Sequence, residues 1–225
     1  MIKNNGQRRM KAIKSKVPFI QLPNNLIRDP KINAVDFVLL FKLKQQTFLH
    51  NSDVIHLPND ALKFSILVSD NKTIKKSYEN LYNHGYLLEP AELVRRKPVK
   101  FAVNPEKLSS PDQYTQLPIY TLQRLDKIKH VGFRLLYYYS SYINSTTASK
   151  LYAYPAIETT KTHLGVHKDT ILQYNRILEK AKLIKIEKHK LEHNHTYDVN
   201  DRIEWNKYNN HYYIYMDKLM VPMSN

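Results

Sequence analysis

The sequence contains no cysteine and only four glycines in its 225 residues. The absence of cysteine excludes disulfides, thiolate zinc sites and cysteine nucleophiles, and it is compatible with a reducing compartment. With so few glycines, no Gly-rich loop is present to hold a nucleotide phosphate. No dense group of carboxylates suggests a magnesium nuclease either. We therefore expect a cytoplasmic protein that is not an enzyme and needs no cofactor.

Long apolar runs are also missing. The longest, around residues 35–41 and 135–139, fall far short of the roughly 20 residues that a membrane span needs. The first sixteen residues lack the hydrophobic stretch of a secretory signal. We therefore expect no membrane partner.

Acidic residues are few compared with basic ones. Lysine and arginine number 35 against 20 acids, which gives a net charge of +15 and a pI near 9.7. This balance favours a polyanionic partner such as nucleic acid. Residues 1–16 carry six of the basic residues and no acid. They are interpreted as a solvated flexible tail, with an arm that follows DNA as the alternative.

The apolar residues, 42% of the chain, follow a pattern that occurs twice. Gln21-Leu22-Pro23 matches Gln116-Leu117-Pro118, 95 residues later. Residues 37–41 match 133–137, with the same i, i+3, i+4 apolar face of a helix, and residues 73–87 match 170–184. Chance alignment of apolar helices is the alternative, but proline, threonine and aromatic positions agree as well. Internal duplication is the better account.

A stretch rich in proline and serine, residues 104–112, separates the two copies and is typical of a linker. The predicted organisation is therefore a basic tail (1–16), a first domain (17–105), a linker (106–114), a second domain (115–219) and a short tail (220–225).

In the second copy, the pattern predicts two helices joined by a tight turn. Pro155 suits the first turn of a helix that runs to about His163, and Gly165 can adopt the left-handed conformation of the turn. A second helix starts at about Lys168 and buries the face of Ile171 and Leu178. Its opposite face, preceded by His167, presents groups that can donate to base edges and phosphates: Lys168, Gln173, Arg176 and Lys180.

Two predicted strands follow this helix, at residues 183–188 and 210–215, and form a β-ribbon. The long loop between them is rich in basic residues and histidine. Lys188 and Lys190 at its start are candidates for contact with a phosphate backbone.

The second copy carries a resemblance to a known family. Leu164-Gly165-Val166-His167, followed by Thr170-Ile171, Leu178 and Leu183-Ile184, resembles the core of bacterial winged-helix DNA-binding domains over about residues 117–216. With the duplication, this resemblance implies an α+β chain of two tandem winged helix-turn-helix domains, each a three-helix bundle with a β-wing.

The first copy fits the same scheme. It predicts a helix at 58–67, an N-cap at Asp70, a recognition helix at 71–84 and a C-terminal glycine, Gly85. A wing then leads to a strand at 99–103. The candidate DNA contacts are on the outer helix face (Lys72, Lys75, Lys76) and around the wing tip (Arg95, Arg96, Lys97, Lys100). The alternative is a merely soluble surface, but helix and wing are basic in both copies.

Two patterns that suggest catalysis have simpler explanations. His193-Asn194-His195 resembles a paired-histidine nuclease motif, but a polar residue stands between the histidines and the flanks resemble a loop, so we expect no metal site. The run Tyr137-Tyr138-Tyr139 offers a potential nucleophile. However, Tyr137 corresponds to Phe41 of the first copy, which indicates a core residue.

Two winged helices with a short linker and a basic tail resemble plasmid and phage replication initiators, especially those that bind iterons. This resemblance implies sequence-specific binding of double-stranded DNA, origin recognition, helix distortion and recruitment of the host helicase machinery. Host replication proteins and a second copy of the chain are further candidate partners. A phage or mobile-element transcriptional repressor is the alternative within the same class. A third alternative is a replisome assembly factor that docks proteins, although that role would not need basic side chains on both recognition helices.

Overall fold

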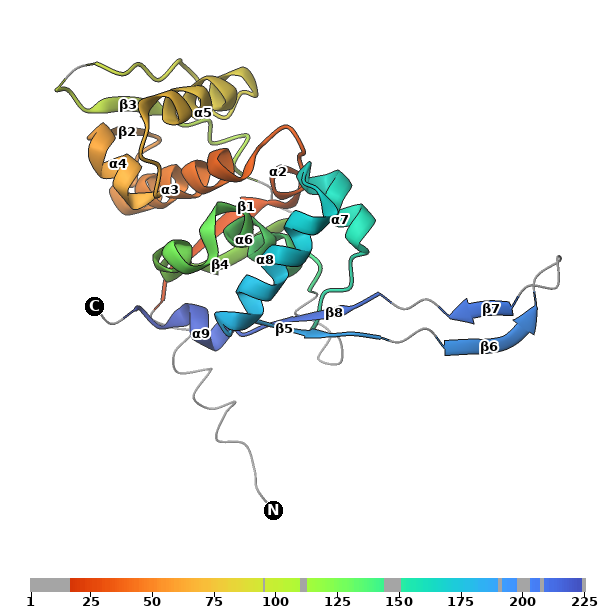
Figure 1. The fold of residues 1–225 in the computed structure, drawn as a ribbon. Helices are drawn as coiled ribbons and strands as arrows, with labels where there is room; N and C mark the ends of the chain where they lie inside the picture. Colours follow the sequence, from red (N-terminus) through yellow and green to blue (C-terminus); the bar gives the residue numbers. More distant parts are fainter. Residues whose placement is uncertain are drawn as a thin grey trace.

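The computed structural model describes residues 17–94, 96–109, 113–143, 151–189, 192–197, 203–206 and 209–223. The described chain is a mixed α and β protein in which helices combine with small antiparallel sheets (Figure 1). Three of the predictions above concern the basic tail (1–16), Arg95 and Lys190, which lie outside the described residues.

The first half of the chain begins with a strand and continues mainly as helices. Its elements are β1 (Phe19–Pro23), α2 (Asn24–Ile27), α3 (Ala34–His50), β2 (Val54–Leu57), α4 (Asn59–Ser65), α5 (Asn71–Asn83) and β3 (Val99–Ala102). The second half follows a similar order, with an isolated bridge at Ala153 in place of a strand between α6 and α7, and extends it. Its elements are β4 (Tyr114–Pro118), η1 (Ile119–Arg124), α6 (Leu125–Ser140), α7 (Ile157–Leu164), α8 (Lys168–Lys180), β5 (Ile184–Glu187), β6 (Glu192–Tyr197), β7 (Ile203–Asn206), β8 (His211–Ile214) and α9 (Met216–Met220).

Local sequence explains where several of these helices begin and end. Asn33 and Asp36 form a capping box at the start of α3, and the Asp70 carboxylate accepts from the Thr73 amide at 2.6 Å at the start of α5. Gly165 ends α7 in the left-handed conformation, with φ of 64°. The predicted N-cap at Asp70 and the predicted turn at Gly165 are thus confirmed.

Each half builds the same small sheet. In the first half β2 pairs with β3, and Leu87 forms a bridge to Val103. In the second half β5 pairs with β8, and Ala153 bridges Tyr212 on the other edge of β8. Each half therefore follows the order helix, strand, helix, helix, strand, strand. Neither β2 nor the short strand-like segment at Ala153 was predicted from the sequence.

The two halves pair with each other through β1 and β4. In this antiparallel ladder Gln21 lies opposite Gln116, the residue that matches it in the duplication, and their side chains are in hydrogen-bond contact at 3.4 Å. Pairing of equivalent residues in an antiparallel ladder places an approximate two-fold axis between them.

Helices α3 and α6 pack around the same axis. The Phe37 and Phe133 ring centroids are 6.4 Å apart, and those of Phe41 and Tyr137 are 5.9 Å apart, so equivalent residues face each other. The crossed pairs also contact, with centroids at 5.3 Å for Phe37–Tyr137 and 5.0 Å for Phe41–Phe133. This reciprocal pattern is that of a two-fold symmetric dimer interface, here inside one chain.

The buried side chains of the two halves form one continuous hydrophobic core. The β1–β4 strand pair and the α3–α6 helix pair join the two halves within this core. Tyr114, placed in the linker by the sequence, is the first residue of β4. Tyr137 is fully buried in this shared core and its hydroxyl donates to the Ile20 carbonyl at 2.8 Å.

The predicted long loop after β5 is not irregular throughout. It contains β6 and β7, which pair antiparallel, so part of the loop is a second ribbon. In Figure 1 this ribbon lies beyond the β5–β8 pair, away from the helices. Strand β6 is almost entirely polar and β7 has only four residues, so neither shows an alternation long enough for a strand to be recognised.

Candidate nucleic-acid interface

Helix α8 has one buried and one exposed face. Ile171 and Leu178 are fully buried against α6 and α7. The predicted contact residues all lie on the opposite, exposed side or just before the helix: His167, Lys168, Gln173, Arg176 and Lys180. His167 is the N-cap residue but makes no side-chain capping bond.

Asn175 lies on the buried face of α8, and sequence analysis did not single it out. Its side-chain oxygen accepts from the Tyr139 hydroxyl of α6 at 2.7 Å. Burial raises the pKa of Tyr139, so this phenol stays neutral and keeps donating. The bond fixes the rotation of α8 on the helix behind it and hence the direction of its exposed face.

Helix α5 is built in the same way. Ile74, Tyr78 and Leu81 are buried, and the Tyr78 hydroxyl donates to the Asn59 side chain of α4 at 3.1 Å. The predicted contact residues Lys72, Lys75 and Lys76 are all exposed. Aligned on the repeat, Lys76 corresponds to Gln173 and Glu79 corresponds to Arg176. The two exposed faces therefore share their place in the fold but differ in chemistry.

The hairpin after α5 carries the other basic residues of the first half. Arg96 and Lys97 are exposed at its tip, where Arg96 has a left-handed φ of 61°. Lys100 lies on β3, and its ammonium is 2.6 Å from the Glu89 carboxylate. Since this ion pair offsets its charge, Lys100 is the weakest of the predicted phosphate contacts.

In the second half, Lys188 is exposed just after β5. The structure thus places the described site residues in separate groups, on α5 with its hairpin and on α8 with its ribbon. It does not gather them into one continuous cluster. The approximate two-fold axis at Gln21 and Gln116 relates the two groups.

Arg134, buried in α6, connects the turn between α7 and α8 to the first half, and sequence analysis did not single it out. Its guanidinium donates to the carbonyls of Leu164 at 3.2 Å, Ile27 at 3.1 Å and Asp29 at 2.7 Å. It also donates to the Ile32 carbonyl. The turn itself meets the same loop, because a Cβ at Gly165 would lie 3.0 Å from the Pro30 carbonyl oxygen.

The charge on Arg134 persists despite its burial. Burial lowers its pKa to about 10, an effect opposed by the nearby carboxylates of Asp29 and Asp36. At neutral pH the guanidinium is thus protonated and offers its donors to the four carbonyls. An arginine inside a helix normally indicates a surface position, so the sequence carried no signal for this role.

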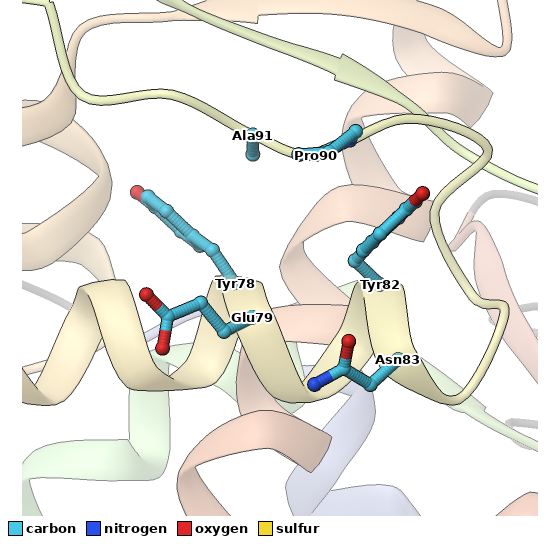
Figure 2. Close-up of a pocket in the computed structure, with 6 residues that line it drawn as sticks. All are labelled: Tyr78, Glu79, Tyr82, Asn83, Pro90 and Ala91. Atoms are coloured by element: carbon cyan, nitrogen blue, oxygen red, sulfur yellow. The ribbon is translucent and has the colours of Figure 1, made fainter.

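A small open cavity of about 160 Å³ lies between α5 and the following segment. Figure 2 shows the rings of Tyr78 and Tyr82 rising from α5 towards Pro90 and Ala91, with Glu79 and Asn83 beside them. This volume is below the range of about 300–1,000 Å³ typical of small-molecule sites. Within the part of the chain that the structure describes, no three metal-ligating side chains gather in a group. No described helix combines the length and apolar character needed to cross a bilayer.

The comparisons with known proteins identify no family, since no protein-family model matches the chain and a search of the curated proteins finds no match.

Proposed function

We propose that this chain binds double-stranded DNA sequence-specifically through two winged helix-turn-helix units, and that it acts as a replication initiator of a plasmid or phage. The order of elements in each half supports the winged-helix assignment. In each half a helix pair joined by a short turn, α4–α5 or α7–α8, is combined with a two-stranded antiparallel sheet, β2–β3 or β5–β8, that one isolated bridge extends.

One observation carries the proposal. At the same place in each repeat, the second helix of the pair exposes cationic side chains that form no ion pair with another described residue: Lys72, Lys75, Lys76, Lys168, Arg176 and Lys180. Cationic side chains without an ion-pair partner on an exposed helix face suit a phosphate-lined major groove, where the helix can also reach the bases.

The approximate two-fold axis adds a geometric expectation. Two reading helices related by such an axis meet a duplex as inverted half-sites. Because α5 and α8 carry different side chains at matching positions, the half-sites differ in sequence. Gln173 and Arg176 on α8 can make bidentate contacts with adenine and guanine, whereas the lysines of α5 act mainly as point charges.

Selection from a random duplex library tests this function. The expected result is an enriched site with two inverted, non-identical half-sites, and affinity that falls by orders of magnitude between about 50 and 200 mM salt. Failure to enrich any motif, together with a flat salt response, contradicts the proposal and favours a protein-docking role.

Charge-matched variants sharpen the test. Lys72→Ala and Lys76→Ala should each lower the slope of log affinity against log salt by about one. Lys127→Ala and Lys218→Ala remove the same charge from exposed positions on α6 and α9 and serve as controls. If the α5 variants and the control variants lower this slope equally, the binding is non-specific attraction between DNA and a basic protein.

The position of the selected site in the DNA distinguishes a replication initiator from a repressor. Direct repeats of the site at an origin support initiation. A single site that overlaps a promoter contradicts the initiator assignment and leaves the DNA-binding assignment intact.

A further inference from the structure

The outer face of the sheet in the second half carries a group of aromatic rings. Residues alternate between the two faces of these strands. Tyr212 points inwards and stacks on Tyr139 of α6, with centroids 4.2 Å apart. Its neighbours on β8, His211 and Tyr213, therefore point outwards, and so do Tyr152 and Tyr154 on either side of the buried Ala153. We call Tyr152, Tyr154, His211 and Tyr213 the aromatic face.

The rings of the aromatic face adjoin one another. Tyr152 stacks on His211 with centroids 3.9 Å apart and planes 23° from parallel. Tyr152 also lies 5.5 Å from Tyr213 and 6.2 Å from Tyr154, measured between centroids. The Tyr154 side chain is 51% exposed, and the other three are only partly buried. The described helices α6 and α8 contact these strands, with the Tyr139–Tyr212 stack on the opposite face.

The fold itself does not require these rings, as the first half demonstrates. Its equivalent sheet, β2 with β3, pairs Val54 with Ala102 and His56 with Lys100. Lys100 and His56 are exposed there, and no tyrosine stands at these positions. Aromatic residues are common in strands because they pair well across them. However, the same strands form in the first half without them, so strand formation does not explain four rings gathered on one face.

The surroundings of the aromatic face favour an anionic ligand with flat rings. The Lys185 ammonium, on the same outer face of β5, lies 5.5 Å from the centre of the Tyr213 ring. Glu187 is the one acid in these strands facing outwards, and its carboxylate is 3.8 Å from Lys185. Burial and the nearby His189 lower the pKa of His211, an effect that Glu187 opposes, so this ring is a neutral stacking partner at pH 7.

We propose that the aromatic face binds single-stranded DNA by stacking unpaired bases on Tyr154 and Tyr213, with Lys185 near the phosphates. Sheets that bind single strands combine these features: exposed rings that accept any base and cations that follow the backbone. This site is separate from the proposed duplex-reading helices. One chain then holds a duplex through its helices and an opened strand through its ribbon.

The binding test uses the full-length chain and a labelled oligothymidylate of about 12 nucleotides, measured by fluorescence anisotropy. Removal of the aromatic ring that stacks on one base costs about fivefold to 150-fold in affinity. We therefore expect Tyr154→Ala and Tyr213→Ala each to weaken binding at least fivefold, and the double variant to weaken it further. Tyr213→Phe keeps the ring and should bind like the wild type. Tyr114→Ala, which removes a 44% exposed tyrosine from β4, is the matched control.

Two further measurements distinguish base stacking from attraction to the phosphates, and single-strand binding from duplex binding. An abasic strand of the same length keeps the phosphates, so its affinity should be low and should not respond to Tyr154→Ala. Duplex affinity should be unchanged in the tyrosine variants, whereas Gln173→Ala and Arg176→Ala should leave oligothymidylate binding intact. Circular dichroism verifies that each variant is folded.

The outcomes are distinct. The proposal is overturned if the wild type and the double variant bind oligothymidylate with equal affinity. It is also overturned if the wild type binds the abasic strand as tightly as oligothymidylate. If the wild type binds the oligothymidylate but no duplex, the proposal stands and the proposed duplex function fails. If an oligoribonucleotide binds more tightly than its DNA counterpart, the commitment to DNA is wrong.

Discussion

Arg134 belongs to the second half of the chain, and its guanidinium donates to the carbonyl of Asp29 in the first half at 2.7 Å. The same side chain donates to the Leu164 carbonyl at the end of α7. One buried residue thus connects the turn before α8 to a loop of the other half, so it bears on the stability of the protein and on the orientation of α8.

Replacement of Arg134 by methionine should cost about 3 kcal/mol of unfolding free energy or more. The buried carbonyls of Ile27, Ile32 and Leu164 would lose the Arg134 donor, and each unsatisfied group costs about 1–3 kcal/mol where it cannot find water. The Asp29 carbonyl would keep its bond from the Ile32 amide. Urea denaturation measures the change. Arg134→Lys keeps the charge but not the fork geometry, so it should fall between the wild type and Arg134→Met. An unchanged midpoint in both variants would contradict this role.

The turn before α8 should tolerate substitution less well than its counterpart before α5. Gly165 has a φ of 64°, and an added Cβ would lie 3.0 Å from the Pro30 oxygen. We expect Gly165→Ala to cost about 1–2 kcal/mol from the left-handed conformation alone. Leu67 occupies the equivalent turn with a φ of 53° and is 44% exposed. Leu67→Gly should therefore change stability by less than about 1 kcal/mol, because relief of strain offsets the entropy of the unfolded chain. Thermal unfolding of the two variants compares them directly.

The stability of the protein should fall as the pH drops below about 6.5. Burial lowers the pKa of His130 from its ordinary value of 6.5, aided by Lys129 and opposed by the hydrogen bond to the Ile66 carbonyl. Between the folded and unfolded pKa values the unfolded chain binds the proton more readily, so acidification favours unfolding. Urea midpoints at pH 7.5 and 5.5 measure the effect. His130→Gln should reduce this difference without abolishing it, because the pKa values of His163 and His211 are lowered as well.

If the duplex-binding proposal is right, some residues should determine sequence preference and others should contribute only to the overall affinity for duplex DNA. Gln173→Ala and Arg176→Ala should relax sequence preference at single positions, by about 1–3 kcal/mol each. Arg96→Ala and Lys97→Ala, at the exposed hairpin tip, should weaken all duplexes about equally. Affinities for the selected site and a scrambled duplex give the comparison. An equal loss of sequence preference in the α8 variants and in the hairpin variants would contradict this assignment of separate roles.

The sequence predicts the helices near the surface well because their signals are local. Helix α5 was predicted at 71–84 and is found at Asn71–Asn83, since Asp70 caps it and its apolar residues repeat with helical spacing. Helix α8 was likewise predicted to start at Lys168. The exposed positions of the candidate contacts on both helices follow from the same periodicity.

The features that were missed depend on residues distant in the chain. Strand β2 has only four residues, and its partner β3 begins more than forty residues later. The pairing of β1 with β4 joins the two copies and leaves no local pattern. Arg134 and Asn175 are polar, so periodicity assigns them to the surface, although hydrogen bonds to the other half or to Tyr139 satisfy them inside. Tertiary contacts, which the sequence does not display, decide these positions.

Gln21 and Gln116, which match in the repeat, pair across β1 and β4, as equivalent residues do at the interface of a symmetric dimer. Two identical subunits must change together, because one gene encodes both sides of their contact. In a single chain the two halves can differ, and each mutation alters one side only. Glu79 and Arg176, which match in the repeat, are a difference of this kind, and so are Leu67 and Gly165, the left-handed residues of the two turns. Because both sides of the β1–β4 contact lie in one chain, the contact keeps a fixed stoichiometry whatever the protein concentration, which frees the outer surfaces for other partners.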